Sequence, residues 1–279
     1  MAHLLSLAFL TVMDAGPVEA VRIAAATGYH MVGLRALPAA AAGEGPYPLL
    51  TDDGLLEEVK AALGETGVRL GDMEIIRLKE ATDVASFAPL LERTAFLGGR
   101  HLLVAGDDTD EARLTGNFAV LCELAARYDL TADLEFMPWT AVKTLADARR
   151  VVEAAAHPNG GVLIDGLHFD RAKSTLDEIR ALPRERINYV QVCDGPVPYD
   201  PSDEGMIFIA RNGRMLPGDG GIDLESMIRA VPDDVTISVE IPLVELARTV
   251  GPMERARMAR EATVRLLEKA GRSVAPALP

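Results

Sequence analysis

The chain has 279 residues and a formal net charge of −14, because 28 lysines and arginines face 42 aspartates and glutamates. Hydrophobic residues make up 49% and charged residues 25%, which is typical of globular proteins and too apolar for a disordered chain. The acidic balance argues against a nucleic-acid-binding protein, since phosphates are neutralised by clustered lysines and arginines. An anionic ligand would need a few placed cations or a metal ion.

The sequence contains two cysteines, Cys122 and Cys193, which are too few for a disulfide framework and indicate a reducing, cytoplasmic compartment. The apolar segment at residues 4–13 resembles a signal peptide only superficially, because it lacks a basic beginning and a clear cleavage site. We interpret it as a buried first strand. No apolar run is long enough to span a bilayer, so we expect no membrane association.

Short apolar runs alternate with longer helical patterns along the whole chain. The predicted strands are continuous apolar runs, as expected for strands buried on both faces, and they occupy residues 4–10, 31–35, 68–78, 101–105, 132–136, 161–165, 187–192 and 236–241. The predicted helices occupy residues 17–27, 52–66, 84–97, 110–128, 144–156, 175–181, 224–230 and 252–270. Pro17, Asp52 and Thr144 are suitable first residues or caps for three of these helices.

Eight strand–helix units in a chain of this length predict an α/β protein made of one (β/α)8 barrel, a TIM barrel, with residues 1–279 as a single domain. The rival is a doubly wound open sheet, which usually has fewer strands and carries a glycine-rich fingerprint when it binds a dinucleotide. No such fingerprint follows the first predicted strand. The longest connections, residues 38–48 and 195–221, follow strands and would lie over the catalytic face of a barrel, where the second is a candidate lid.

Four predicted strands carry one oxygen-bearing side chain near their carboxyl ends: Glu135, Asp165, Gln191 and Glu240. In a barrel these ends meet at the active-site face. The three carboxylates would repel one another, and a buried carboxylate is unfavourable unless it is paired or bound to a metal. A divalent cation resolves the repulsion, and these oxygen ligands suit Mn²⁺ or Mg²⁺, with Co²⁺ as a further option, better than a thiolate-type zinc site.

The alternative is that these carboxylates have only structural partners. Each would then cap a loop or pair with one of the arginines Arg35, Arg77 and Arg211. We favour the metal site, because four such residues at four strand ends form a more specific pattern than any one of them alone.

The segments around these residues resemble the xylose isomerase-like TIM-barrel superfamily, which includes sugar-phosphate isomerases and epimerases, inosose and 3-dehydroshikimate dehydratases, and endonuclease IV. The matching segments read Leu-Glu-Phe at 134–136, Asp-Gly-Leu-His at 165–168, Val-Gln-Val-Cys-Asp at 190–194, Pro-Gly-Asp-Gly-Gly-Ile-Asp at 217–223 and Ser-Val-Glu-Ile-Pro at 238–242. The resemblance implies one metal ion held by Glu135, Asp165, Gln191 and Glu240. It also implies that His168 contacts the substrate or a metal-bound water.

The chain departs from the common epimerase pattern at Gln191, where that pattern has a histidine. A neutral carbonyl oxygen can ligate the same metal but shifts the preference further toward hard cations. The resemblance to endonuclease IV does not extend to its three-zinc site, which needs several further histidines. This chain has five in all: His3, His30, His101, His157 and His168.

The resemblance implies a divalent-metal-dependent isomerase or epimerase of a small sugar or sugar derivative. In the superfamily the metal polarises a substrate carbonyl or hydroxyl, and a carboxylate, here Glu135 or Glu240, removes the adjacent carbon-bound proton to give an enediolate. Expelling a β-hydroxyl from the same intermediate would instead make the protein a dehydratase, a lyase acting on a keto-polyol such as 3-dehydroshikimate or an inosose. A third hypothesis is a barrel without turnover that serves as a partner subunit.

Other residues are candidates for contacting a polyol or sugar substrate. Arg35, Glu74, Arg77 and Arg211 are placed near strand ends or in the long connection, where an arginine suits a carboxylate or phosphate group. Solvated loop positions or ion pairs are the competing interpretation for these residues. Trp139, the single tryptophan, is either a flat wall against a sugar ring or a packed loop residue. We also expect Asp194 to orient a neighbouring ligand, and we leave a homo-oligomer open.

Overall fold

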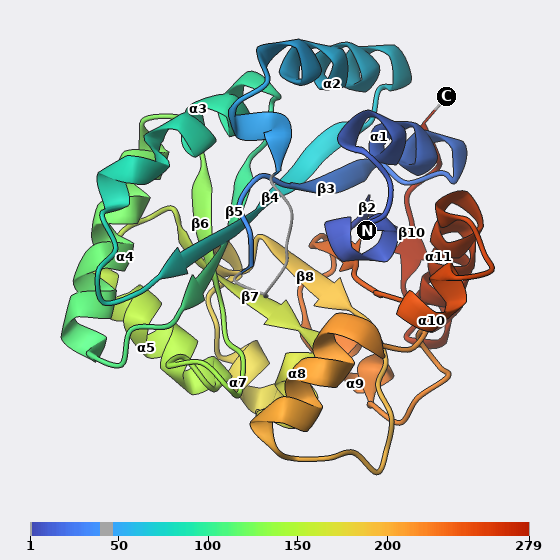
Figure 1. Ribbon diagram of the computed structural model, residues 1–279. Coiled ribbons are helices and arrows are strands. Elements are labelled where there is room, and N and C mark those ends of the chain that lie inside the picture. The colour runs from blue at the N-terminus through green and yellow to red at the C-terminus, as the bar shows by residue number, and fades with distance from the viewer. Residues whose placement is uncertain (1, 40–46, 279) are drawn as a thin grey trace.

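The computed structural model describes residues 2–39 and 47–278, and its centre is a closed barrel of eight strands (Figure 1). Every pairing in the barrel is parallel, and the last strand closes it against the first through the registers Leu5–Ile237, Ser6–Ser238 and Leu7–Val239. The predicted (β/α)8 architecture is therefore confirmed. The barrel strands are β2 (Leu5–Leu7), β3 (Met31–Arg35), β4 (Arg69–Leu78), β5 (His101–Gly106), β6 (Thr131–Glu135), β7 (Gly160–Asp165), β8 (Tyr189–Val192) and β9 (Thr236–Val239).

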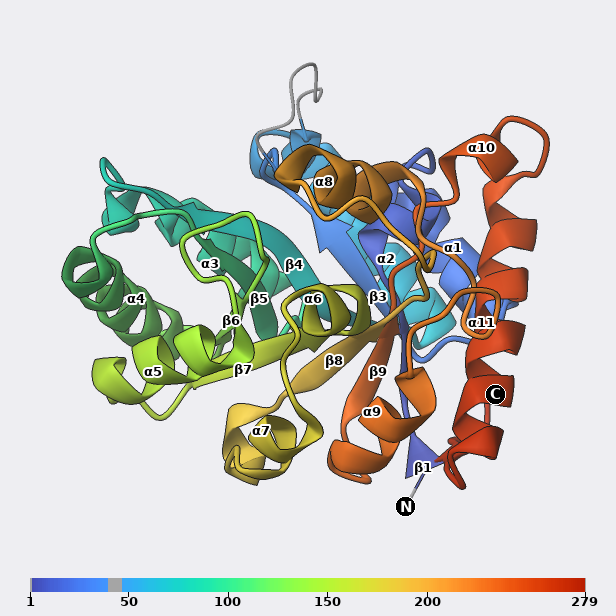
Figure 2. The same ribbon diagram turned by 90° about the horizontal axis from the view of Figure 1, so that it is seen from below.

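Helices surround the strands as an outer ring (Figures 1 and 2). The helices of the ring are α1 (Pro17–Ala26), α2 (Asp53–Thr66), α3 (Ala88–Phe96), α4 (Glu111–Ala126), α5 (Leu145–Ala155), α7 (Leu176–Arg180), α9 (Leu224–Ala230) and α11 (Pro252–Lys269). Further helices follow the ends of β7, β8 and β9, namely α6 (Gly166–Arg171), α8 (Asp203–Asn212) and α10 (Val244–Ala247). Four 3-10 helices complete the described elements: η1 (Phe9–Val12), η2 (Pro48–Leu50), η3 (Val84–Phe87) and η4 (Arg184–Arg186).

Local sequence signals explain several helix ends. Asp52 accepts a hydrogen bond from the backbone N–H of Leu55 at 2.9 Å and so caps the start of α2. Gly67 ends this helix with φ +73°, a left-handed conformation in which glycine is favoured. Thr144 and Asp147 form a reciprocal capping box at the start of α5. These helices begin and end where the sequence predicts, within a residue.

The strands face two apolar layers. The larger cluster lies between the strands and the helices and includes alternate strand residues such as Leu102 and Val104. A second cluster fills part of the barrel interior, because the side chains between those positions point inward. Its buried members are Ile75, Leu103, Ala105, Met137, Leu163 and Tyr189. Other inward positions carry buried polar side chains, among them Glu74, Glu135 and Gln191.

The first predicted strand is too long, since β2 ends at Leu7 and the 3-10 helix η1 begins at Phe9. The chain turns there because Thr11 fastens it to the end of β9: its hydroxyl donates to the carbonyl of Val239 at 2.7 Å and accepts from the N–H of Ile241 at 2.8 Å. The sequence analysis therefore assigned to a strand two residues, Phe9 and Leu10, that line the cavity described below.

Further elements were not predicted, among them α6, α8, α10 and the two strands at the ends of the chain. The connection at 195–221 contains the ten-residue helix α8, which begins after the cap residue Ser202, whose hydroxyl accepts from Gly205 at 3.1 Å. The ends of the chain form a separate two-stranded parallel pair, β1 (Ala2–His3) and β10 (Ser273–Val274). The expectation that residues 38–48 lie over the catalytic face falls mainly on residues 40–46, which are outside the described residues. No described helix combines the length and the apolar character that a membrane span requires.

Candidate active site

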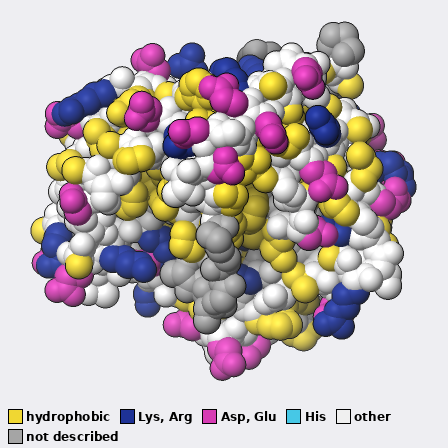
Figure 3. Space-filling view, turned by 45° about the horizontal axis from the view of Figure 1, so that its top comes forward, with side chains coloured by type: hydrophobic (Ala, Val, Ile, Leu, Met, Phe, Trp, Pro, Cys, Tyr) yellow, Lys and Arg dark blue, Asp and Glu magenta, His cyan; other side chains and the backbone are white. Residues whose placement is uncertain are grey.

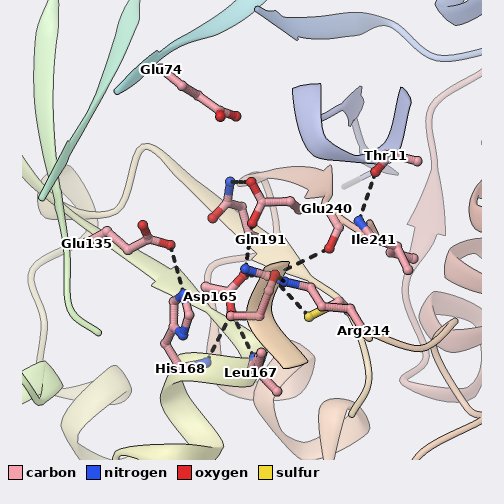
Figure 4. Close-up of polar contacts among 12 residues, drawn as sticks. Thr11, Glu74, Glu135, Asp165, Leu167, His168, Gln191, Arg214, Glu240 and Ile241 are labelled. Atoms are coloured by element: carbon pink, nitrogen blue, oxygen red, sulfur yellow. Dashed lines mark hydrogen bonds and ion pairs between the residues drawn. The ribbon is translucent and has the colours of Figure 1, made fainter. Parts of the chain in front are cut away.

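The four side chains at the predicted strand ends meet inside the mouth of the barrel (Figure 4). Glu135 and Asp165 are the last residues of β6 and β7, Gln191 lies in β8, and Glu240 follows β9 directly. All four are buried. The parallel order of the strands explains this convergence, because all carboxyl ends of a barrel open on one face.

Asp165 is held by the helix that begins immediately after it. One carboxylate oxygen, Oδ1, accepts backbone N–H groups from Leu167 at 2.8 Å and from His168 at 3.0 Å. Asp165 is thus the cap of α6, which satisfies two backbone donors that the helix itself leaves without partners. Part of the structural alternative is therefore correct for this residue, but its second oxygen remains directed toward the other carboxylates (Figure 4).

The second oxygen of Asp165 contacts Arg214, a residue of the connection at 195–221 that is not among the predicted site residues. Arg214 Nη1 lies 2.5 Å from Asp165 Oδ2, and Nη2 lies 2.8 Å from Glu240 Oε2. None of the arginines expected as structural partners takes this position. A local signal was lacking, because Arg214 reaches the site from the segment after α8 and not from any barrel strand.

Gln191 joins the cluster through its amide. Gln191 Nε2 donates to Glu240 Oε1 at 3.0 Å, and the carbonyl oxygen Oε1 is buried with no hydrogen-bond partner among the described residues. A buried carbonyl oxygen without a donor is unfavourable in a protein interior. This oxygen is therefore available to coordinate a cation or to accept a hydrogen bond from a bound molecule.

His168 lies beside Glu135, with its Nε2 3.6 Å from Glu135 Oε1. Burial lowers the pKa of His168 to about 4, so the imidazole is neutral at pH 7. The ring of Trp139 packs edge-on against it, with the centroids 5.0 Å apart. Glu135, Asp165 and His168 each direct one ligand atom to a region where these atoms lie within 4.8 Å of one another, an arrangement suited to a metal ion.

The carboxylates of the site differ in their protonation equilibria. Burial, together with the charges of Glu240 and Asp165, raises the pKa of Glu135 well above its ordinary value. Burial also raises the pKa of Glu240, to about 8, although Arg214 opposes this shift. For Asp165 burial acts in the same direction, but the charge of Arg214 and the hydrogen bonds around the carboxylate outweigh it and leave the pKa lowered.

The donor set fits a divalent cation. In the ionised form that would hold a metal, Glu135, Asp165 and Glu240 carry three negative charges, and Arg214 balances one of them. The remaining charge of −2, the unpartnered Gln191 oxygen and the oxygen-rich surroundings match a single hard divalent ion. Glu135, Asp165, Gln191 and Glu240 are the residues that would hold it, with His168 adjacent.

A cavity of about 630 Å³ opens above these residues, and its lining includes Glu74, Glu135, His168 and Glu240. Glu74 is paired with Arg35, whose Nη2 lies 2.7 Å from Glu74 Oε2. The second oxygen of Glu74 has no hydrogen-bond partner in the described part of the chain. The structure therefore brings both residues to the cavity as predicted, but as a buried ion pair with one available acceptor.

The other predicted substrate residues also line the cavity. Arg77 is paired with Asp107, with Nη1 2.5 Å from Oδ2. Arg211, near the end of α8, makes no ion pair or hydrogen bond with its guanidinium among the described residues. Trp139 forms part of the wall. Of these side chains, Arg211 is the cation best placed to meet an anionic group of a ligand.

Asp194 has a different role from the one predicted. Its carboxylate accepts backbone N–H groups from Gly195 at 2.8 Å, Gly218 at 3.0 Å and Ile222 at 3.0 Å. It therefore fastens the two ends of the connection after β8 and does not contact the four candidate ligands directly. The glycine-rich run at 217–221 is part of this turn.

The apolar side of the cavity was not predicted from the sequence. Its members lie in or directly after η1, in strands β4 and β5, and just after β6, and they include Phe9, Met13, Ile75, Leu103 and Met137. Figure 3 shows apolar side chains gathered across the middle of one face, with charged side chains of both signs around them. The inward position of Leu103 could have been deduced from alternation within β5. The position of Ile75 could not, because the register of β4 is irregular there and the adjacent Glu74 lines the cavity as well. The η1 residues could not, because η1 was assigned to a strand.

Comparison with known proteins relates this site to a family. The family model for the xylose isomerase-like TIM barrel matches residues 21–266. An inosose isomerase of Bacillus licheniformis is 26% identical over 200 residues, which are 67% of this chain and 69% of that protein. A 3-dehydroshikimate dehydratase of Pseudomonas putida is 28% identical over 123 residues, or 44% of this chain, and the match spans only 19% of that longer enzyme.

Solved structures show the same fold. A structure described as the IOLI protein with a binding zinc atom superposes with a TM-score of 0.79 and 18% identity, covering 95% of this chain and 98% of its own. The curated relatives are enzymes of the two activity classes that the sequence analysis named, an isomerase and a dehydratase. With the family model matching most of the chain and the barrel closed as expected, this protein belongs to the xylose isomerase-like TIM-barrel family.

Proposed function

We propose that the protein is a divalent-metal-dependent isomerase or epimerase of a small cyclic polyol or sugar derivative. The observation that carries the proposal is the convergence of Glu135, Asp165, Gln191 and Glu240 beside a cavity of about 630 Å³. Similarity to inosose isomerases over two thirds of the chain supports the substrate class. We further propose Mn²⁺ or Mg²⁺ as the native ion, although the related barrel with a zinc atom makes Zn²⁺ worth testing alongside Co²⁺.

A bound divalent ion would polarise a substrate carbonyl and stabilise the negative charge that develops on its oxygen. Glu135 is the proposed base, because its carboxylate contacts no arginine and has a pKa raised by burial, which strengthens it as a proton acceptor. Glu240 approaches from a strand end across the barrel and is the proposed donor of the returning proton. The result is transfer of one proton, either to the other face of the same carbon or to the neighbouring carbon.

The remaining residues would position the substrate. Neutral His168 can donate a hydrogen bond to a substrate oxygen while it stays beside Glu135. The unpaired oxygen of Glu74 can accept from a hydroxyl, and Arg35 holds that carboxylate in place. Trp139 offers an aromatic face or edge to a ring. The apolar wall excludes water and thereby strengthens these interactions.

A second candidate function is supported by a separate observation. Among the described residues the guanidinium of Arg211 has no partner, and the cavity that it lines also has apolar members, a combination that suits a ring bearing a carboxylate. This favours a dehydratase of 3-dehydroshikimate type, in which the base removes a proton and the substrate loses a β-hydroxyl as water. A site for an uncharged inosose has no need of Arg211.

The two candidates are separated by assaying the purified protein with Mn²⁺ in D₂O. With inosose, NMR detection of deuterium on ring carbons without loss of water supports the isomerase. With 3-dehydroshikimate, growth of catechol-type absorbance supports the dehydratase, and Arg211→Gln should then raise KM about tenfold with little change in kcat. Absence of both signals with Mn²⁺, Mg²⁺, Co²⁺ and Zn²⁺ would favour the third hypothesis, a barrel without turnover.

A further inference from the structure

Arg214 is the only arginine of the described chain that contacts two of the proposed ligand side chains. It is almost completely buried, and its position is fixed by groups outside the ligand set. Nε donates to the carbonyl of Ala210 at 2.9 Å. The next residue, Met215, exchanges backbone hydrogen bonds of 2.9 and 2.8 Å with Asp194. The guanidinium is therefore anchored to a firmly held turn.

The guanidinium also determines the charge of the site. Glu74 is already neutralised by Arg35, so the uncompensated groups are Glu135, Asp165, Glu240 and Arg214. With all three carboxylates ionised, as ligands of a metal, their sum is −2, which one divalent ion cancels. Without Arg214 the sum would be −3, and Asp165 and Glu240 would face each other without the cation that now lies between their oxygens. Buried like charges in this position repel strongly.

We propose that Arg214 is a positioning residue that sets both the charge and the affinity of the metal site. It holds one oxygen of Asp165 and one oxygen of Glu240, and it restricts the site to a single divalent ion of moderate affinity. This inference rests on the metal site of the proposed function. It leads to an unusual expectation: removing Arg214 weakens the metal-free protein but strengthens metal binding, because the ligand carboxylates lose a competing positive charge.

A matched control comes from Arg171, the last residue of α6, which contacts the same connection. Arg171 is also buried, donates to the carbonyl of Pro196 at 2.8 Å and lies over the ring of Tyr199 at 3.7 Å. It fastens the start of the connection after β8 but makes no contact with a candidate ligand in the described residues. Arg171→Gln therefore loosens the same segment while it leaves the charge of the site unchanged.

The test is isothermal titration calorimetry of EDTA-stripped full-length protein with Mn²⁺. Changes in groups that contact metal ligands shift metal affinity by about 10- to 100-fold, and because Arg214 contributes positive charge we expect Arg214→Gln to lower the Kd for Mn²⁺ at least about tenfold. Arg214→Lys keeps the positive charge but loses part of the guanidinium contacts, so we expect its Kd to change less than that of Arg214→Gln. Arg171→Gln should leave the Kd unchanged. Thermal unfolding should show a lower Tm for metal-free Arg214→Gln and a larger gain in Tm on adding Mn²⁺.

An unchanged or weaker affinity in Arg214→Gln would overturn the inference, as would equal tightening in Arg171→Gln, which would indicate a general loosening of the segment. If Arg214→Gln folds only with metal, it is purified with Mn²⁺ and its release into excess EDTA is timed. Slower release than in the wild type supports the inference, and equal or faster release overturns it. Absence of Mn²⁺ binding by wild-type protein would remove the proposed metal site itself, so the two failures are distinguishable.

Discussion

Two levels of the barrel interior contain buried carboxylates, and they are stabilised in different ways. The upper level consists of Glu74 and Glu135 with the two acids from β7 and the end of β9, and two arginines contact it. The lower level consists of Asp72 and Asp133, each two residues earlier on the same strand as Glu74 and Glu135. Side chains two residues apart on a strand share a face, so β4 and β6 each carry one acid of the lower level and one of the upper level.

The lower level has no arginine contact among the described residues. Asp133 instead accepts hydrogen bonds from two neutral donors, Thr131 Oγ1 and Asn188 Nδ2, both at 2.6 Å. Neither oxygen of Asp72 has a hydrogen-bond partner in the described chain. Neutral donors fix a carboxylate in place, whereas a surplus of charge beside fixed cations creates an environment for an ion and a polar substrate. We therefore assign a structural role to the acids of the lower level and a role in ligand binding and catalysis to the acids of the upper level.

The sharpest test of this division compares two acids of β6. Glu135→Gln keeps the shape of the side chain but removes the proposed base, and general acid–base groups contribute about 10²- to 10⁴-fold to rate. We expect kcat/KM to fall about a thousandfold on the substrate that the wild type converts, with no loss of unfolding free energy. Steady-state kinetics and urea unfolding measure the two effects. Retention of more than a tenth of the activity would contradict the role of Glu135.

The sequence was sufficient to predict the barrel and the acids of the upper level, because both leave local signals. A single polar residue near the end of a continuous apolar run, as at Asp165 and Gln191, marks a strand end, and parallel strands bring such ends together. Their convergence is therefore a consequence of topology and needs no knowledge of side-chain packing.

The missing parts depend on contacts between distant segments. Arg214 lies 49 residues after Asp165 in the sequence, and its approach to the site depends on α8 and on the turn that Asp194 holds. The strand assignment at residues 4–10 failed because Thr11 bonds to the end of β9, more than 200 residues away. The cap at Ser202 was a local signal for α8 that could have been recognised.

The second prediction concerns Asp133, the lower partner of Glu135 on β6. Asp133→Asn replaces one acceptor oxygen by an N–H₂ group that faces a donor, either Thr131 or Asn188. An unsatisfied buried polar group costs about 1–3 kcal/mol, so we expect the unfolding free energy to fall by about 2 kcal/mol. Activity per folded molecule should change less than threefold or so. A large loss of kcat without a loss of stability would place Asp133 in the chemistry and break the division.

A third prediction uses the pH dependence of Asp72. Burial and the charges of Glu74, Glu240 and Asp133 raise its pKa well above the ordinary value, while Arg35 opposes them. Above about pH 4 the unfolded chain has lost this proton but the folded protein retains it, so stability falls as the pH rises, by at most about 1.4 kcal/mol per pH unit. Asp72→Asn cannot lose this proton. In urea unfolding of EDTA-treated protein, the unfolding free energy of the variant relative to the wild type should therefore rise by up to about 1 kcal/mol per pH unit between pH 5 and 7.

An equal pH dependence in the wild type and in Asp72→Asn would show that Asp72 is ionised in the folded protein. An ordered cation or donor would then have to compensate the charge, and the lower level would resemble the upper one. If Asp72→Asn is more stable than the wild type only at high pH, the division is intact. The carboxyl group of Asp72 is then uncharged in the folded protein and cannot attract an ion.

The smallest expected effect concerns Tyr189, which lines the same lower level with its ring 5.5 Å from that of His101. Its hydroxyl is buried without a hydrogen-bond partner among the described residues. Tyr189→Phe should therefore change the unfolding free energy by less than about 0.5 kcal/mol. Tyr29 is the matched control, because its buried hydroxyl donates to the carbonyl of Ala256 at 3.1 Å, and Tyr29→Phe should cost about 1 kcal/mol. If Tyr189→Phe proves the more costly change, the lower level must contain ordered water that bonds this hydroxyl, and its acids would then be solvated groups connected to the site above them.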